Sequence, residues 1–302
     1  TPTTSSSHGT VGTSSATVTI DVAKTVKAIA VKDDYRASSV ASASYTISGV
    51  ATPLSAPDDV TITTMNASSF TATWEAADNA SGYSWKLSTS SDPSDAAITG
   101  GSGSIGSGST ETVTVSSGIS LTAGTRYYFH IKSVGDGVSY SDSDYESAHL
   151  GYYTLTPDQS STGSSATAYI TSLTEFTYNS VSWKMNQWNP KTLQVRTNQS
   201  SAESEFRFYN TSAFSGRITK VVITFSALTV SDASKLMFLG GSKEVTATTG
   251  GTAGTWNSTT KTITWTPGSS DNYTYFAFYQ NGKAASGTNN LAESNAIFVN
   301  YE

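Results

Sequence analysis

Apolar and polar residues alternate in many short runs along the chain, and residues such as Gly, Ser, Asn and Pro separate the runs. Residues 70–74 (Phe-Thr-Ala-Thr-Trp) and 181–185 (Val-Ser-Trp-Lys-Met) show the pattern clearly. Alternation places every second side chain on one face, which is typical of half-buried β-strands. Many short strands between turn residues favour sandwiches. The pattern therefore predicts an all-β protein built from tandem β-sandwich modules.

Turn-rich stretches divide the 302 residues, which are enough for two or three domains with separate cores. Residues 1–48 hold only three strand-like runs (16–22, 25–32 and 39–47), too few to close a sandwich. Residues 49–57 read as a linker, residues 58–150 as one domain and residues 151–165 as a second linker. Residues 166–302 are expected to form a jelly-roll-like sandwich, with strands near 168–170, 181–185, 193–196, 205–209, 218–225, 235–239, 262–265, 273–279 and 296–301.

The middle region carries the most specific motif, Leu-Thr-Ala-Gly-Thr-Arg-Tyr-Tyr-Phe-His-Ile at residues 121–131. Its spacing is that of a tyrosine corner, and with Trp74 and Tyr83 it resembles a fibronectin type III domain over nearly all of residues 58–150. The resemblance implies that Leu121 plugs the base of the core and that Gly124 lets the chain turn. It also implies that Tyr127 is buried beside Trp74, with its hydroxyl bonded to the local backbone.

Two further resemblances concern the flanking regions. Residues 25–40 (Thr-Val-Lys-Ala-Ile-Ala-Val-Lys and onward), ending in Ala-Ser-Tyr-Thr-Ile at 43–47, resemble the last strands of the chitobiase/β-hexosaminidase C-terminal-type module, which is structural. Residues 206–223, with the terminal Ile-Phe-Val-Asn-Tyr-Glu, resemble β-sandwich domains of surface and secreted proteins of gut Bacteroidota and their phages. The first module is therefore expected to be either a fragment of a longer module or a module whose missing strands a neighbouring chain supplies by strand complementation.

Composition narrows the possible partners. A formal net charge of −6 and a pI near 5.1 offer no basic stripe for phosphates, which disfavours nucleic acid and anionic lipid. Cysteine is absent, so disulfides and thiolate chemistry are excluded, and no apolar run reaches the length of a membrane span. We therefore expect neither nucleic-acid binding nor membrane insertion.

Catalytic groups are scarce. His8 and His149 lie in segments expected to be irregular, and alternation from Tyr127 points His130 away from the core, so we expect an exposed, non-catalytic ring. Nucleophile-elbow, phosphate-loop and zinc-protease motifs are missing. The sequence therefore predicts no enzyme and no cofactor, with calcium as the one metal considered.

The calcium hypothesis rests on Asp142, Asp144 and Glu146, which alternate in Ser-Asp-Ser-Asp-Tyr-Glu. On a strand they project from one face, with Asp136 in the preceding loop, and oxygen ligands that converge in this way can hold Ca²⁺. The alternative is a solvated acidic edge that discourages aggregation between strands.

The ligand hypothesis rests on Trp188, because sugar rings stack on exposed aromatic faces while amides bond their hydroxyls. Asn186, Gln187 and Asn189 surround it, and Trp256 also lies near a turn. By contrast, Trp183 and Trp265 sit within apolar alternation and are expected in the core.

Taken together, the sequence suggests a non-catalytic extracellular surface, adhesion or spacer protein whose terminal sandwich contacts a glycan or a protein. One alternative is a virion-exposed phage fibre or decoration protein. The other is the accessory tail of a secreted hydrolase.

Overall fold

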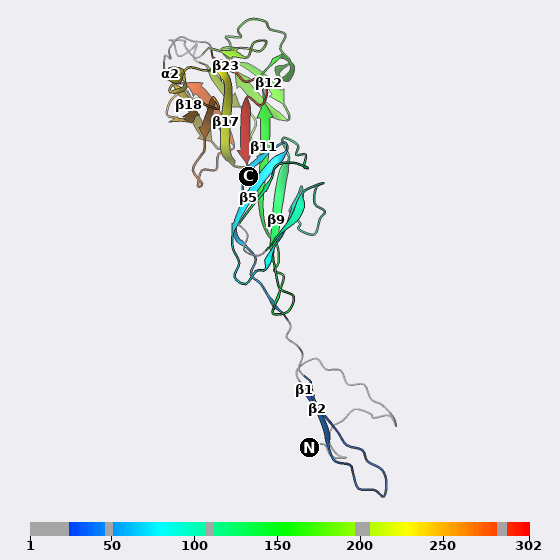
Figure 1. Ribbon diagram of the computed structural model, residues 1–302. Helices are drawn as coiled ribbons and strands as arrows, with labels where there is room; N and C mark the ends of the chain where they lie inside the picture. The colour runs from blue at the N-terminus through cyan, green and yellow to red at the C-terminus, as the bar shows by residue number, and fades with distance from the viewer. Residues whose placement is uncertain (1–23, 46–50, 107–110, 197–205, 283–288) are drawn as a thin grey trace.

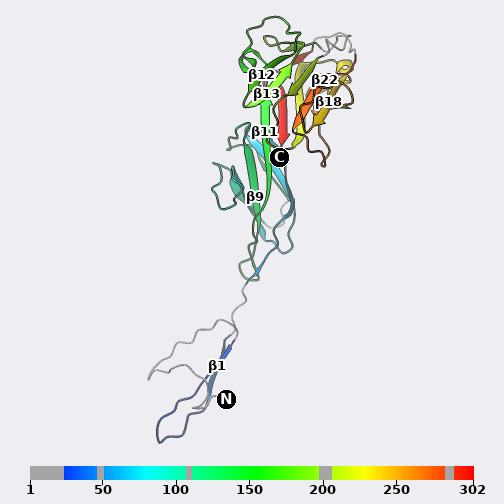
Figure 2. The ribbon, with the colours of Figure 1, turned by 180° about the vertical axis from the view of Figure 1, so that it is seen from behind.

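The computed structural model describes residues 24–45, 51–106, 111–196, 206–282 and 289–302. Within this part the chain forms an N-terminal hairpin and two β-sandwiches, as Figures 1 and 2 show from opposite sides. The two helices, α1 (Gln159–Thr162) and α2 (Val230–Ala233), are single turns capped by Asp158 and Thr229. The expected class, tandem β-sandwich modules, is confirmed.

The first sandwich has the strand arrangement of a fibronectin type III domain. One sheet has the order β4-β5-β8, and the facing strands run β7-β6-β9-β11. A short parallel pair, β3 with β10, closes the end nearest the hairpin. The strand bounds are β3 (Thr52–Pro53), β4 (Asp58–Asn66), β5 (Ser69–Glu75), β6 (Gly82–Ser88), β7 (Ser102–Gly106), β8 (Thr112–Val115), β9 (Arg126–Val134), β10 (Tyr140–Ser141) and β11 (Glu146–Leu155).

The tyrosine corner forms as predicted. Tyr127 is buried, and its hydroxyl oxygen accepts a hydrogen bond from the backbone N–H of Thr122 at 2.8 Å. Gly124 has a φ of 85°, a conformation in which glycine has no Cβ penalty. Leu121 and Trp74 belong to the same apolar core as Tyr127. The local sequence thus specifies both the turn and the ring that anchors it.

A second tyrosine, which the sequence pattern did not reveal, also pins this corner. The Tyr152 hydroxyl donates to the carbonyl of Leu121 at 2.6 Å, and the N–H of Gly124 donates to the carbonyl of Tyr152 at 2.8 Å. Burial raises the pKa of Tyr152 to about 12, so the hydroxyl stays a donor at neutral pH. The corner is therefore tied to β11 as well as to its own strand.

The second sandwich packs a six-stranded layer, in the order β12-β13-β16-β22-β18-β19, on a layer that includes β14-β15-β23-β17-β24. The chain changes layer repeatedly, in the jelly-roll-like manner expected. The bounds are β12 (Thr174–Tyr178), β13 (Val181–Met185), β14 (Trp188–Asn189), β15 (Gln194–Val195), β16 (Arg207–Asn210), β17 (Ile218–Ala227), β18 (Leu236–Gly241), β19 (Thr252–Ala253), β20 (Thr255–Asn257), β21 (Thr262–Trp265), β22 (Tyr275–Gln280), β23 (Asn290–Leu291) and β24 (Ile297–Tyr301).

Strand β11 belongs to both sandwiches, and Figure 1 shows it crossing from one to the other. Residues 146–151 pair with β9 of the first sandwich, and residues 151–155 pair with β24 of the second. A single sheet of eleven strands results. The prediction of a linker beginning at residue 151 is wrong, because the alternation of the strand continues through Leu155 and finds a second partner strand there.

The two faces of β11 serve different cores. Leu150 and Tyr152 lie in the core of the first sandwich, whereas Tyr153 and Leu155 lie in the core of the second. Strand β24 repeats the division, since Phe298 packs on the first core and its neighbours on the second. The shared sheet therefore continues from one sandwich into the other, and the second sheet of each sandwich packs on the opposite face of it.

Polar contacts lock the same junction. The Asn300 side-chain amide donates to the carbonyls of Met65 and Gly151, each at 3.3 Å, and Arg126 donates to the carbonyl of Ser215 at 2.8 Å. At Gly151 an added Cβ would lie 2.5 Å from the Tyr301 ring, so only glycine allows this approach. Side chains of both sandwiches thus interlock around β11.

The N-terminal hairpin differs from both sandwiches. Strands β1 (Lys24–Ala28) and β2 (Ala41–Tyr45) pair in antiparallel register, and their side chains are exposed apart from half-buried Val26. A two-stranded hairpin without a covered face is marginally stable in water. The predicted run at 16–22 lies outside the described residues, and the proposed completion of this module by another chain stays a prediction.

Candidate functional site

Trp188, the predicted sugar-stacking residue, lies in the core. Its ring has no exposed surface, its Nε1–H donates to the carbonyl of Pro157 at 3.0 Å, and it packs beside Phe176. The alternation that placed it outside stops at Gln187, where a φ of 54° turns the chain from β13 into β14. The prediction of an exposed aromatic face at Trp188 is therefore wrong.

The amides around Trp188 are buried too, and their bonds organise the loop. Asn186 Oδ1 accepts from the N–H of Arg207 at 2.8 Å, and Asn189 Oδ1 accepts from the N–H of Lys191 at 3.0 Å. Gln187 is 3% exposed. Short polar side chains that bond the local backbone are common in turns. Asn186, Gln187 and Asn189 therefore support the core and offer no saccharide contact.

The other tryptophans divide as follows. Trp183 and Trp265 are buried, which confirms the prediction that both belong to the core. Trp256 lies half-buried on edge strand β20 and packs against the second core, paired with Ile263 of β21. Trp256 therefore forms no joint site with Trp188, which belongs to the β14-β15 pair.

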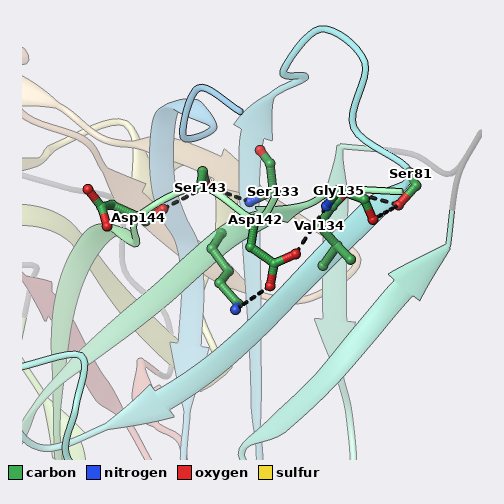
Figure 3. A network of polar contacts seen from close by, with 8 residues as sticks. Ser81, Ser133, Val134, Gly135, Asp142, Ser143 and Asp144 are labelled. Atoms are coloured by element: carbon green, nitrogen blue, oxygen red, sulfur yellow. Dashed lines mark hydrogen bonds and ion pairs between the residues drawn. The ribbon is translucent and has the colours of Figure 1, made fainter. Parts of the chain in front are cut away.

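The acidic residues after β9 point apart, as Figure 3 shows for Asp142 and Asp144. Asp142 forms an ion pair with Lys132 at 2.6 Å and accepts from the N–H of Gly135 at 3.1 Å. The Lys132 bond, followed by the Gly135 bond, lowers the pKa of Asp142. Glu146 lies further along, at the start of β11, and bonds its neighbour Ser147.

Asp136 has a different task in the same loop. Its Oδ1 accepts the N–H groups of Val138, Ser139 and Tyr140 at 2.7–2.8 Å, and these bonds lower its pKa. In the described part of the chain no three acidic or histidine side chains are grouped to hold a metal ion. The calcium hypothesis is therefore not supported, and these residues shape the loop before β11.

His130 is buried, contrary to the prediction. The ring does point away from the core, but the segment after β6 folds over that face and covers it. Nε2 lies 3.0 Å from the carbonyl of Ser90 and 3.1 Å from Ser88 Oγ, and Nδ1 lies 2.7 Å from Ser147 Oγ. Alternation gives the direction of a side chain but not what a later segment lays over it.

A serine hydroxyl next to an imidazole can form a nucleophile–base pair. Here His130 Nε2 faces a carbonyl oxygen, which accepts only, so Nε2 carries the proton and Nδ1 accepts from the Ser147 hydroxyl. Burial lowers the pKa of His130. The His130 ring is fully buried, so a substrate cannot reach this pair unless the covering segment opens.

Two adjoining cavities open at the end of the second sandwich that lies away from the first. This is the end where β17 finishes and β24 begins, because Ile218 pairs with Tyr301 at the junction and Ile223 pairs with Ile297 beyond it. The larger cavity has a volume of about 350 Å³. Asp158 and Glu293 line both cavities. We call the pair the distal groove; its other lining residues include Lys191, Thr192, Ser226, Asn290, Ser160, Tyr178 and Asn295.

Comparisons with known proteins return β-sandwiches. The chain is similar to the fn3 domain of human collagen alpha-1(XX), at 19% identity over 37% of this chain and 96% of that one, with a TM-score of 0.26. It is also similar to the FN1-FN3 domains of chicken CNTN1, at 15% identity over 78% of this chain and 65% of that one, with a TM-score of 0.24. A third match is a redesigned β-sandwich protein, at 20% identity over 32% of this chain and 87% of that one, with a TM-score of 0.25.

No protein-family model matches the sequence, and no curated protein is similar to it in sequence. Since the three TM-scores are low, the assignment of the fold rests on the strand order and the tyrosine corner. Within the described residues, no helix has the length and apolar character needed to cross a membrane. Strand order and corner define a tandem β-sandwich protein with a fibronectin type III-like first sandwich.

Proposed function

We propose that this chain is a non-catalytic part of an extracellular surface or adhesion protein. The fibronectin type III-like sandwich is its rigid stalk, and the second sandwich presents its distal end to a glycan or a protein. The supporting observation is strand β11, whose residues pair with β9 and then with β24. Domains joined by a flexible linker reorient freely, whereas domains that share a strand cannot turn without breaking the ladder.

The candidate catalytic groups among the described residues are covered or already bonded, which agrees with a non-catalytic chain that presents its second sandwich to a partner. His130 lies within hydrogen-bond distance of two serine hydroxyls, Ser88 and Ser147, and the histidine ring is covered. Asp142 and Asp136 are engaged by Lys132 and by backbone N–H groups. Hydrolysis of glycosides or esters by the purified chain, abolished by Ser147→Ala, would contradict this part of the proposal.

The stalk can be tested by measuring distances between spin labels. The sequence has no cysteine, so two introduced cysteines label uniquely. Thr114→Cys with Ser242→Cys spans the two sandwiches, and Thr177→Cys with Ser242→Cys is the control within the second sandwich; all three positions are exposed. We expect the distance distribution of the spanning pair to be as narrow as that of the control. A distribution several times broader would show that the sandwiches reorient.

A further inference from the structure

We propose that the distal groove binds a neutral saccharide chain. The proposal rests on the presenting role given above and adds the place and the chemistry of the contact. It replaces the predicted site at Trp188, which is buried. The groove occupies the loops at the free end of the second sandwich, opposite the junction, and loops at the end of a β-sandwich are a common place for binding residues.

The groove is built to bond hydroxyl groups. The N–H of Ser161 donates to Asp158 Oδ1 at 2.7 Å. This bond holds the carboxylate in place and leaves Oδ2 to accept from a ligand. Glu293 lines both cavities, is exposed and forms no ion pair among the described residues. Carboxylates accept strong hydrogen bonds from hydroxyls, and two of them on adjoining cavities can bond successive sugar units.

Asn290 lines the larger cavity and carries one polar atom without a hydrogen-bond partner. Its Nδ2 donates to the carbonyl of Thr192 at 3.2 Å, which fixes the amide plane. Its Oδ1 is shielded from solvent and has no hydrogen-bond partner, although buried polar atoms are usually bonded. Asn290 lines the larger cavity, and because Oδ1 is shielded there, its side chain must rotate before a ligand hydroxyl can bond to this oxygen.

The charges select the class of saccharide. Asp158 and Glu293 occur in both cavities, whereas Lys191 lines only one. Carboxylates lining both cavities oppose an anionic ligand, so uronic acids, sialic acids and phosphates are disfavoured. The polar lining also lacks the deep apolar pocket that an aromatic or aliphatic anchor of a protein partner would need. Pro190, Leu291 and Tyr178 supply only modest apolar contact.

The test is a calorimetric and saturation-transfer NMR titration of the full chain. The probes are linear neutral tetrasaccharides of glucose, mannose, galactose and N-acetylglucosamine, with tetragalacturonate as the acidic comparison. We expect at least one neutral probe to bind with a Kd on the order of 1 mM, because a shallow site buries little area. Glu293→Gln and Asn290→Ala should each weaken binding by about tenfold, the effect of losing one strong hydrogen bond. Glu111→Gln, an exposed acidic position on the first sandwich, should leave it unchanged.

Three results would overturn the proposal. One is that no neutral probe binds, another is that binding is unaffected by Glu293→Gln and Asn290→Ala, and the third is preference for tetragalacturonate. Glu293 is exposed and Asn290 is half-buried, so a circular dichroism spectrum and melting curve like those of the parent chain will show whether both variants fold. The spin-label distances test the rigid stalk separately. If no saccharide binds while the spin-label distance distribution is narrow, the saccharide site is refuted and the rigid stalk is retained.

Discussion

The two halves of β11 show how one strand can connect two domains without a linker. Its first half, residues 146–151, pairs with β9; Leu150 of this half and Tyr152, which follows it, point into the first core. Its second half pairs with β24 and sends Tyr153 and Leu155 into the second core, on the opposite face. The difference lies only in which side of the sheet is covered. The junction is therefore stabilised by the same burial and pairing that stabilise each domain.

The largest expected effect comes from truncating the adjacent tyrosines on the two faces. Tyr152→Ala and Tyr153→Ala each remove a buried ring and should cost about 3–5 kcal/mol of unfolding free energy. If the halves of β11 are one cooperative unit, each variant lowers the same single thermal transition. The exposed Tyr35→Ala in the hairpin, at 69% exposure, is the control and should stay within about 0.5 kcal/mol. Two separate transitions, of which each variant moves only one, would argue for independent domains.

The close approach at the crossing gives the next effect. Gly151→Ala places a methyl group against the Tyr301 ring, and overpacking of this kind costs about 1–3 kcal/mol. The effect should shrink in a Tyr301→Ala background, because the ring that clashes is then gone. Chemical denaturation of the two single variants and the double variant measures the coupling. If the free-energy changes of the two single variants simply add in the double variant, Gly151 does not lie against the Tyr301 ring as described.

A smaller loss of unfolding free energy is expected at the tyrosine corner, which belongs to the first sandwich. Tyr127→Phe removes the acceptor for the N–H of Thr122, and Tyr152→Phe removes the donor to Leu121. Each should cost about 1 kcal/mol, the usual contribution of one intramolecular hydrogen bond. Tyr128→Phe, at a half-exposed position on the same strand, is the matched control. Denaturation midpoints no lower for the two corner variants than for the control would contradict the pinned corner.

The smallest effect is a dependence of stability on pH that arises from the covered histidine. Burial lowers the pKa of His130 below 6.5, so between the two values the unfolded chain binds more protons than the folded chain. Stability should be constant above pH 6.5 and decline as the pH falls toward the folded pKa. The pKa of His149 is lowered as well. Melting curves of His130→Gln and His149→Gln between pH 7.5 and pH 4.5 separate the contributions of the two histidines. If the melting temperature of His130→Gln falls with pH as steeply as that of the parent chain, the assignment to His130 is contradicted.

The first sandwich could be predicted from the sequence because its signals are local. Leu121, Gly124 and Tyr127 lie within seven residues, and the turn and the buried ring follow from their spacing. Strands such as β13 and β21 were likewise predicted with the bounds observed. Alternation within one strand carries enough information to assign its faces.

The errors arise where distant segments decide the environment. Trp188 is inside because Gln187 reverses the chain, and His130 is covered because Ser90 lies over it. Residues 151–155 form a strand because β24, almost 150 residues later, provides the partner. The distal groove combines Asp158 with Asn290 and Glu293, and no spacing in the sequence indicates that they meet.

The most direct test of the shared strand is amide hydrogen exchange, followed by mass spectrometry, across residues 148–156. Backbone N–H groups in a continuous ladder exchange only when the structure opens. We expect a peptide covering these residues to be as protected as one covering β9 (Arg126–Val134). Exchange of the 151–155 segment within seconds, at the rate of an unstructured peptide, would contradict the account, because it would show a linker where we describe one strand that joins two sandwiches.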